Sequence, residues 1–224
     1  MMKFFIFLSL LMLCFSFSAP SPAFAARDIL LDSAPTQKFS ASKLSRWEEI
    51  LSSHVSDIYN SQNPNIDTWN AFIETLEGEP KLRQILKVNA WFKQFPYKQD
   101  NWVYNQDDYW ATPTEFLTYG GDCEDYAIIK YVTLRKLGFS PADMKIAIVY
   151  DVYSGTDHAF LTVKHEGAEF VLDNREKVAV SRYMKNRYKP HYAFNEKDMW
   201  TYASPVIVQK MRKSVGGAVL PGNR

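Results

Sequence analysis

The spacing of apolar residues changes near Gly138, and this change limits the fold more than any other feature of the chain. Before Gly138, apolar residues recur at steps of three and four, which is typical of one face of a helix. This spacing predicts helices from Ser40, as N-cap, to about residue 60, around Trp69, from about Pro80 to Phe92, and from Cys123 to Leu137. After Gly138, short apolar runs predict strands at 145–150, 158–164 and 168–173, with shorter ones at 178–180 and 205–209. Helices followed by an antiparallel sheet make an α+β fold.

Two segments lack clear periodicity. Residues 27–39 are mostly polar and are expected to form an ordered or frayed leader. Residues 95–119 are rich in aromatic side chains, which argues against disorder in so long a segment. We expect an irregular loop there that forms one wall of a cleft, and a packed surface meander is the alternative.

The N-terminus has the features of a secretory signal peptide. Met1-Met2-Lys3 is followed by an apolar run over residues 4–17, and Ala23-Phe24-Ala25 has the form of a cleavage site. We expect residues 1–25 to be removed and residues 26–224 to form a single exported domain. No later stretch approaches about 18 apolar residues, so we predict no direct membrane insertion.

Charge and cysteine content narrow the function classes. Removal of residues 1–25 takes away Lys3, and equal numbers of basic and acidic residues remain. A net charge near zero does not indicate binding to nucleic acid or to an anionic membrane. The same cleavage removes Cys14, so Cys123 is the only cysteine left, and a solitary thiol in an oxidising compartment is expected to be either used or buried.

Cys123 lies in the segment GGDCEDYA, residues 120–127, where two glycines and an acidic residue lead into the fourth predicted helix. In the first turn of a helix, unpaired N–H groups and the helix dipole favour an anion, so a thiolate there is stabilised. The segment therefore predicts a nucleophile. The alternative is a buried structural cysteine, since free cysteines are often buried.

The predicted hairpin brings a histidine and a carboxylate together. The turn is expected at 166–167 or in a slightly longer loop; a four-residue loop would keep the same faces and a three-residue loop would reverse them. A two-residue turn places His165 opposite Ala168. Further along the hairpin, Asp173 then lies diagonally across from His158 on the same face, within reach of its side chain.

Other residues compete for these two roles. Asp157 and Asn174 are the rivals of Asp173, but each should point to the opposite face of the hairpin. The rivals of His158 are His54, His165 and His191, and none of them has a carboxylate placed to orient it.

Cys123, His158 and Asp173 together suit thiol acyl chemistry. The imidazole takes the thiol proton and later delivers it to the leaving amine, while the carboxylate holds the ring's tautomer. The backbone N–H of Cys123, with a donor from the aromatic loop, would form an oxyanion hole. The same triad would serve transamidation or amide hydrolysis. The chain has no H-E-x-x-H zinc motif, no G-x-S-x-G elbow and no phosphate-binding glycine loop.

Four segments carry a family resemblance: GGDCEDYA, DDYWATPTEFL at 107–117, DHAFLTV at 157–163 and VLDN at 171–174. Together they resemble the bacterial transglutaminase-like cysteine proteinases of the LapG type, most clearly over residues 80–180. The resemblance implies a papain-like, transglutaminase-like α+β fold, with the catalytic helix packed on an antiparallel sheet. It also implies that Cys123 is the nucleophile, His158 the base and Asp173 the orienting acid.

The resemblance further implies a biological role that spacing and composition do not. Members of the family are periplasmic, calcium-dependent endopeptidases. The expected substrate is the N-terminal region of a large surface adhesin, cleaved near a pair of alanines to release the adhesin and disperse a biofilm. The expected regulator is an inner-membrane cyclic di-GMP receptor, which sequesters the protease through its periplasmic domain.

The acidic residues around Cys123 have two interpretations. Asp122 and Asp125 fit an ordinary capping box at a helix start, which is the simpler explanation from the residues alone. Left uncompensated, however, the negative charges around Cys123 would raise the thiol pKa, and a calcium ion would relieve them.

The resemblance implies that a calcium ion is bound by Asp122 and Glu124. Asp125, Asp107 and Asp108 are candidates for further ligands. If Cys123 is instead buried and inert, the chain is a non-catalytic calcium-binding or adaptor module.

Overall fold

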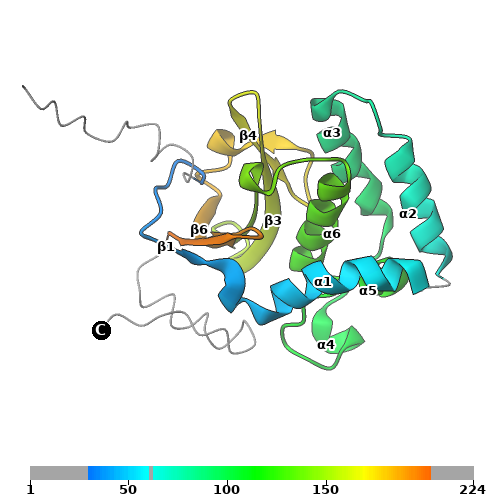
Figure 1. The fold of residues 1–224 in the computed structure, drawn as a ribbon. Helices are drawn as coiled ribbons and strands as arrows, with labels where there is room; N and C mark the ends of the chain where they lie inside the picture. The colour runs from blue at the N-terminus through cyan, green and yellow to red at the C-terminus, as the bar shows by residue number, and fades with distance from the viewer. Residues whose placement is uncertain (1–29, 61–62, 203–224) are drawn as a thin grey trace, which may run out of the picture.

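A layer of helices lies beside one strongly curled antiparallel sheet (Figure 1). The computed structural model describes residues 30–60 and 63–202. The helices are α1 (Ser45–Asn60), α2 (Pro64–Glu74), α3 (Lys81–Trp91), α4 (Asp100–Val103), α5 (Pro113–Tyr119) and α6 (Cys123–Lys136), with 3-10 turns η2 (Ala41–Lys43), η3 (Phe92–Gln94), η4 (Pro141–Asp143) and η5 (Ser181–Tyr183). The strands are β1 (Gln37–Ser40), β2 (Met144–Asp151), β3 (Thr156–His165), β4 (Ala168–Leu172), β5 (Ala179–Val180), β6 (Tyr188–Phe194) and β7 (Asp198–Thr201). The predicted α+β class is confirmed.

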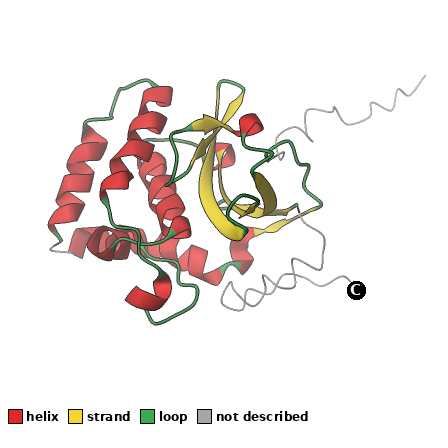
Figure 2. Cartoon of the chain, turned by 180° about the vertical axis from the view of Figure 1, so that it is seen from behind, coloured by secondary structure: helices red, strands yellow, loops and turns green. Residues whose placement is uncertain are grey.

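The sheet has the order β1-β7-β6-β2-β3-β4-β5, and all its pairs are antiparallel. Seen from behind, the helices gather on one side of the molecule and the sheet curls on the other (Figure 2). The longest pairings join β2 to β3 and to β6, in the middle of the sheet. The strand that carries His158 is therefore a central one.

Helix α6 joins the two layers. Residues 125–134 of α6 are all buried, and the helix packs against β2 and β3 on one side and α3 and α5 on the other. A helix that is enclosed on all sides lies in the core of a domain. Cys123, at the start of this helix, is therefore held by the most constrained element of the fold.

The β3–β4 hairpin has the predicted register. His165 lies opposite Ala168 and Leu161 opposite Leu172. The turn residues Glu166 and Gly167 have φ values of 49° and 75°, as a tight two-residue hairpin turn requires. The face shared by His158 and Asp173 follows from this register.

The expectation of an irregular loop over residues 95–119 is wrong. The segment contains α4 and α5, and α5 begins with a capping box. The Thr112 side chain accepts a bond from the Glu115 N–H at 3.3 Å, and the Glu115 carboxylate accepts one from the Thr112 N–H at 2.7 Å. Trp110 and Phe116 are buried in the core. The T-x-x-E spacing after an aromatic run was the signal for this helix.

The end of the sheet also differs from the prediction. Strands β6 and β7 were not predicted, and Pro190 hides β6 because proline is rare within strands. A bulge opposite Ile148 and Val149 accommodates it, since Pro190 and Tyr192 pair there while His191 is skipped.

At the N-terminal side, β1 was not predicted either, and it pairs with β7. Ser40 caps η2 rather than α1.

Three predictions lie outside the described residues: the signal peptide at 1–25, the strand at 205–209 and the frayed tail. Among the helices of residues 30–60 and 63–202, none is long and apolar enough to cross a bilayer.

Candidate active site

Cys123 is the first residue of α6, and two glycines shape the chain that leads to it. Gly120 has a φ of 80°, and a side chain on it would collide with the Pro96 backbone. A side chain on Gly121 would collide with the carboxylate of Asp125. The glycines thus let the chain turn closely into the helix, which fixes where the thiol lies.

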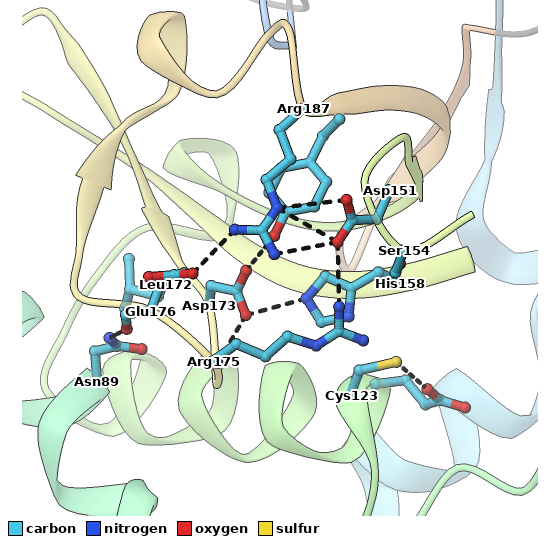
Figure 3. Close-up of polar contacts among 12 residues, drawn as sticks. Asn89, Cys123, Asp151, Ser154, His158, Leu172, Asp173, Arg175, Glu176 and Arg187 are labelled. Carbon is cyan, nitrogen blue, oxygen red and sulfur yellow. Dashed lines mark hydrogen bonds and ion pairs between the residues drawn. The ribbon is translucent and has the colours of Figure 1, made fainter. Parts of the chain in front are cut away.

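His158 and Asp173 form a buried pair on the neighbouring hairpin (Figure 3). His158 Nε2 lies 3.0 Å from Asp173 Oδ1, and the two residues are 1% and 0% exposed. Asp173 also accepts bonds from the Tyr188 hydroxyl at 2.6 Å and the Arg175 N–H at 2.9 Å. Burial alone would raise the pKa of Asp173, but the bonds and charge of these partners, chiefly His158, outweigh it and hold the pKa well below its usual range.

The other ring nitrogen of His158 is the one available for chemistry. Among the described residues, Nδ1 of His158 is buried and has no hydrogen-bond partner. The half-buried thiol of Cys123 contacts the backbone of Ala159, the residue after His158 on β3. The thiol donates its hydrogen bond to Glu124 Oε2 at 3.1 Å (Figure 3). The structure therefore places the Cys123 thiol against the strand that carries His158, and it pairs His158 with Asp173.

The rivals of this pair have other partners or positions. Asp157 bonds to His191 Nε2 at 3.1 Å, on the other face of the hairpin, so the expectation that His191 has no carboxylate beside it is wrong. His165 lies at the hairpin tip, 3.7 Å from Glu166. The side chain of the remaining rival base, His54, lies outside the described residues.

A group of carboxylates surrounds the other side of Cys123. Three groups in the described part of the chain hold possible ligand atoms within 4.8 Å of one another: Asp122, Cys123 and Glu124; Asp100, Asp108 and Glu124; and Asp100, Asp122 and Asp125. Asp107 belongs to none of them. Asp100 was not predicted, because nothing in the sequence shows that α4 carries it back to the start of α6. Together, Asp122, Glu124, Asp125, Asp108 and the unpredicted Asp100 make up what we call the acidic cluster.

Within the acidic cluster, Asp125 has a structural role. Its Oδ2 accepts a bond from the Asp122 N–H at 3.1 Å, and its Oδ1 accepts one from the Ala111 N–H at 2.7 Å. The expected capping-box contact is thus present. Asp125 both caps α6 and holds the 95–119 segment against it.

The acidic cluster fits a hard cation. Within residues 30–60 and 63–202, none of its carboxylates forms an ion pair with a lysine or arginine, and Oδ1 of Asp100 and Oδ1 of Asp122 are buried without a partner. Burial raises the pKa of both Asp100 and Asp108 to about 6 and that of Glu124 to about 7. Burial and the charge of Glu124 raise the pKa of Asp122 to about 9. Several oxygen ligands whose negative charges are uncompensated are what Ca²⁺ prefers.

A family model, the bacterial transglutaminase-like cysteine proteinases, matches residues 60–205, well over half of the chain. The chain belongs to this family.

Solved structures of LapG from Legionella pneumophila support the assignment. The calcium-bound form is 29% identical, with a TM-score of 0.57, over 73% of this chain and 98% of LapG. The EGTA-treated form is 33% identical, with a TM-score of 0.56, over 69% and 84%. A third LapG structure is 30% identical, with a TM-score of 0.57, over 77% and 97%. A search of curated proteins found no match.

The surroundings of the Cys123 thiol disfavour its ionised form. Burial, then the charges of Glu124 and Asp122, raise the pKa of Cys123 well above its ordinary value. The position at the helix start favours a thiolate, but burial and the surrounding carboxylates outweigh it.

Two residues that hold Asp173 and its strand in place, Tyr188 and Lys130, were not predicted from the sequence. Tyr188 lies on β6, which was not predicted. Lys130, buried two turns along α6 from Cys123, donates to the Leu172 carbonyl at 3.2 Å and so joins α6 to the strand that leads into Asp173. Burial lowers the pKa of Lys130 to about 7. Lys130 was not predicted to be buried, because a lysine within a helix is usually exposed, although the residues on both sides of it are apolar.

Proposed function

We propose that this proteinase is a calcium-dependent cysteine endopeptidase in which Cys123 is the nucleophile, His158 the general base and Asp173 the residue that orients His158. The observation that carries the proposal is the buried His158–Asp173 pair, whose unpartnered Nδ1 lies on the strand against which the thiol packs.

The hydrogen bonds suggest how the roles divide. With Nε2–H donating to Asp173, the lone pair of Nδ1 takes the thiol proton. The thiolate then attacks the peptide carbonyl carbon, and the imidazolium returns the proton to the leaving amine as the C–N bond breaks. Water, deprotonated by His158, next hydrolyses the thioester, which releases the acid and regenerates the thiol. The N–H of Cys123 is the proposed oxyanion donor.

Calcium would be held by Asp122 and Glu124, with Asp100 and Asp108 as further ligands. The support is the buried, unpartnered oxygens of the acidic cluster and the likeness to a LapG structure described as calcium-bound. When bound, the ion would supply positive charge that offsets the carboxylates around the thiol. Asp125 would stay in its capping role, because both of its oxygens have partners.

The substrate and partner proposals rest on the family resemblance. We propose that the mature chain acts in the periplasm after loss of residues 1–25, and that it cleaves a large surface adhesin near a di-alanine site. Release of the adhesin would disperse a biofilm. A cyclic di-GMP receptor would hold the protease inactive through its periplasmic domain.

The test uses a purified N-terminal adhesin fragment that contains a di-alanine site. With calcium, the wild-type protein should cut it once, near the alanines, and Cys123→Ala should leave it intact while keeping the wild-type circular dichroism spectrum. Cleavage by Cys123→Ala would contradict the nucleophile assignment. A product carrying an added primary amine in place of water would indicate a transamidase. If the wild-type protein also leaves the fragment intact but binds calcium, a non-catalytic module is favoured.

The receptor proposal has a separate test. The isolated periplasmic domain of the receptor should capture Cys123→Ala as well as wild type, and it should slow cleavage of the fragment when added in excess. A domain that captures neither protein would contradict the proposed regulation without affecting the catalytic assignment.

A further inference from the structure

An open groove of about 570 Å³ lies beside the catalytic residues. It runs between the chain that follows α3 and the chain that follows β4. Its lining residues are Lys93, Phe95, Tyr97, Tyr126, Asn174 and Arg175. A groove of this volume is large enough for one or two side chains of a bound peptide.

The groove adjoins the triad on both sides. Tyr97 pairs through its backbone with Gly121, two residues before Cys123. Arg175 follows Asp173 by two residues, and its N–H bonds to the Asp173 carboxylate. The Tyr97 hydroxyl is close enough to feel the charges of Cys123, Asp122 and Glu124 on one side and of Arg175 on the other. The groove is therefore within a few residues' reach of a peptide bound at the thiol.

The charge of the groove is positive. Lys93 and Arg175 line it, and no carboxylate does. Lys93 is exposed and forms no ion pair among the described residues. Its charge is also felt by the buried Lys130 beneath.

Arg175 is only partly neutralised. Its guanidinium reaches Asp151 at 3.2 Å, but the same carboxylate binds Arg187 at 3.2 Å (Figure 3). One carboxylate thus serves two guanidinium groups, and Arg187 draws further compensation from Glu176 at 3.0 Å. The Arg175 side chain remains about one-third exposed, so part of its charge faces the solvent.

Apart from Asn174, the rest of the lining is aromatic. The rings of Tyr97 and Tyr126 stack at 6.5 Å, and the Tyr126 hydroxyl donates to the Phe95 carbonyl. These rings offer apolar surface for the methylene groups of a side chain whose charged end reaches Lys93 or Arg175.

We propose that this groove is a specificity subsite that binds an acidic side chain of the substrate, aspartate or glutamate, a few residues from the scissile bond. The inference rests on the proposed endopeptidase function. It predicts that one position of the substrate is selected by charge. No carboxylate lines the groove, so an acidic side chain bound there would meet the charges of Lys93 and Arg175 directly.

The test uses peptides from a denatured proteome digest, incubated with the protein and calcium and read by mass spectrometry. Sites cut by the wild type and not by Cys123→Ala should show acidic residues enriched at one position. A matched peptide pair with glutamate or lysine at that position then measures the preference. Lys93→Glu should lower kcat/KM for the glutamate peptide roughly three- to fivefold, the effect of one exposed ion pair, and raise it for the lysine peptide. The effect should lie in KM and shrink at high salt.

Lys98→Glu is the matched control, because Lys98 is exposed nearby but does not line the groove. It should leave the preference unchanged. Cleavage without acidic enrichment, or equal effects of Lys93→Glu and Lys98→Glu, would refute the subsite and leave the endopeptidase function standing. If no peptide is cut by the wild type beyond those cut by Cys123→Ala, the function itself fails and the subsite falls with it.

Discussion

The two sides of the site differ in how far the chain itself satisfies their polar atoms. On the hairpin side, both oxygens of Asp173 have partners: Oδ1 bonds to His158 and to the Arg175 N–H, and Oδ2 to Tyr188. On the helix side, Oδ1 of Asp100 and Oδ1 of Asp122 are buried without partners. The pKa shifts follow this difference, since the pKa of Asp173 is held down while burial and Glu124 raise that of Asp122 to about 9.

We call the hairpin side the complete side, because its carboxylate is fully partnered within the chain, whereas two carboxylate oxygens on the helix side have no partner among the described residues. The hairpin side is built by strand register and is expected to keep its geometry under all conditions that keep the sheet. The helix side places carboxylates around a thiol that becomes an anion in the proposed mechanism, and an added positive charge would offset them. Activity would then be controlled at the nucleophile and not at the base.

The largest effect is expected from a substitution in the His158–Asp173 pair of the hairpin side. Asp173→Asn keeps the shape of the side chain but removes the charge that stabilises the imidazolium, so kcat should fall roughly 100- to 10,000-fold. Steady-state cleavage of the adhesin fragment measures it. Asp157→Asn is the matched control. Asp157 lies on the same hairpin, but it pairs with His191 of β6 and not with His158. Equal rates for Asp173→Asn and the wild type would remove Asp173 from the mechanism.

The next largest effect is expected from removing the calcium proposed to bind the acidic cluster. Chelation should abolish most cleavage reversibly, and saturating calcium should raise the melting temperature on the order of 5–10 °C, because the ion binds only the folded protein. Calcium titrations followed by thermal unfolding measure both effects.

Two variants test which residues bind the ion. Asp100→Asn should weaken calcium binding at least about tenfold. Asp107→Asn should not, because Asp107 is exposed and lies outside the acidic cluster. Full activity in a chelator would overturn the calcium assignment, and equal affinities of the two variants would remove Asp100 from the site.

A smaller effect is expected from removing the charge of Glu124 beside the Cys123 thiol while keeping the shape of its side chain. Glu124→Gln removes the negative charge that accepts the thiol hydrogen bond, so the pKa of Cys123 should fall. Without calcium, the rate of Cys123 alkylation at pH 7 should therefore rise several-fold to tenfold above that of the wild type. Glu48→Gln, on the exposed face of α1, should change nothing. A slower reaction in Glu124→Gln would show that this carboxylate activates the thiol.

The same comparison explains which parts of the site could be read from sequence. The His158–Asp173 face followed from a two-residue turn and the alternation of strand side chains, which are local rules. The start of α6 followed from its glycines and acidic cap. These features depend only on residues close in sequence.

What the sequence did not reveal depends on contacts between distant segments. Asp100 lies near Asp122 only because α4 folds back to the start of α6, and Tyr188 reaches Asp173 from a strand hidden by Pro190. Lys130 looks like an exposed helix residue until the sheet covers it. The 95–119 segment was mistaken for a loop because its aromatic residues obscured the capping box at Thr112.

The smallest effect is expected at Tyr188, one of the hydrogen-bond partners of Asp173 on the hairpin side. Tyr188→Phe removes one of the bonds that hold the pKa of Asp173 down, while His158 and the Arg175 N–H remain. We expect a loss of activity of less than about tenfold and a loss of about 2 kcal/mol in the free energy of unfolding at pH 7.

The loss should have a characteristic pH dependence. A carboxylate with a lowered folded pKa stabilises the protein above its unfolded pKa, and that stability is lost as pH falls through the folded value. Because the Tyr188→Phe variant has a higher folded pKa at Asp173, its acid unfolding should begin at higher pH than that of the wild type, while its stability relative to wild type should be constant from pH 6 to 8. Tyr131→Phe, which breaks a buried contact to Glu196 at 3.4 Å, is the control, and it should leave both activity and the acid midpoint of Asp173 unchanged. If acid unfolding of Tyr188→Phe begins at the same pH as that of the wild type, His158 and Arg175 alone hold the pKa of Asp173 down. Asp173 would then keep its charge without the Tyr188 hydroxyl.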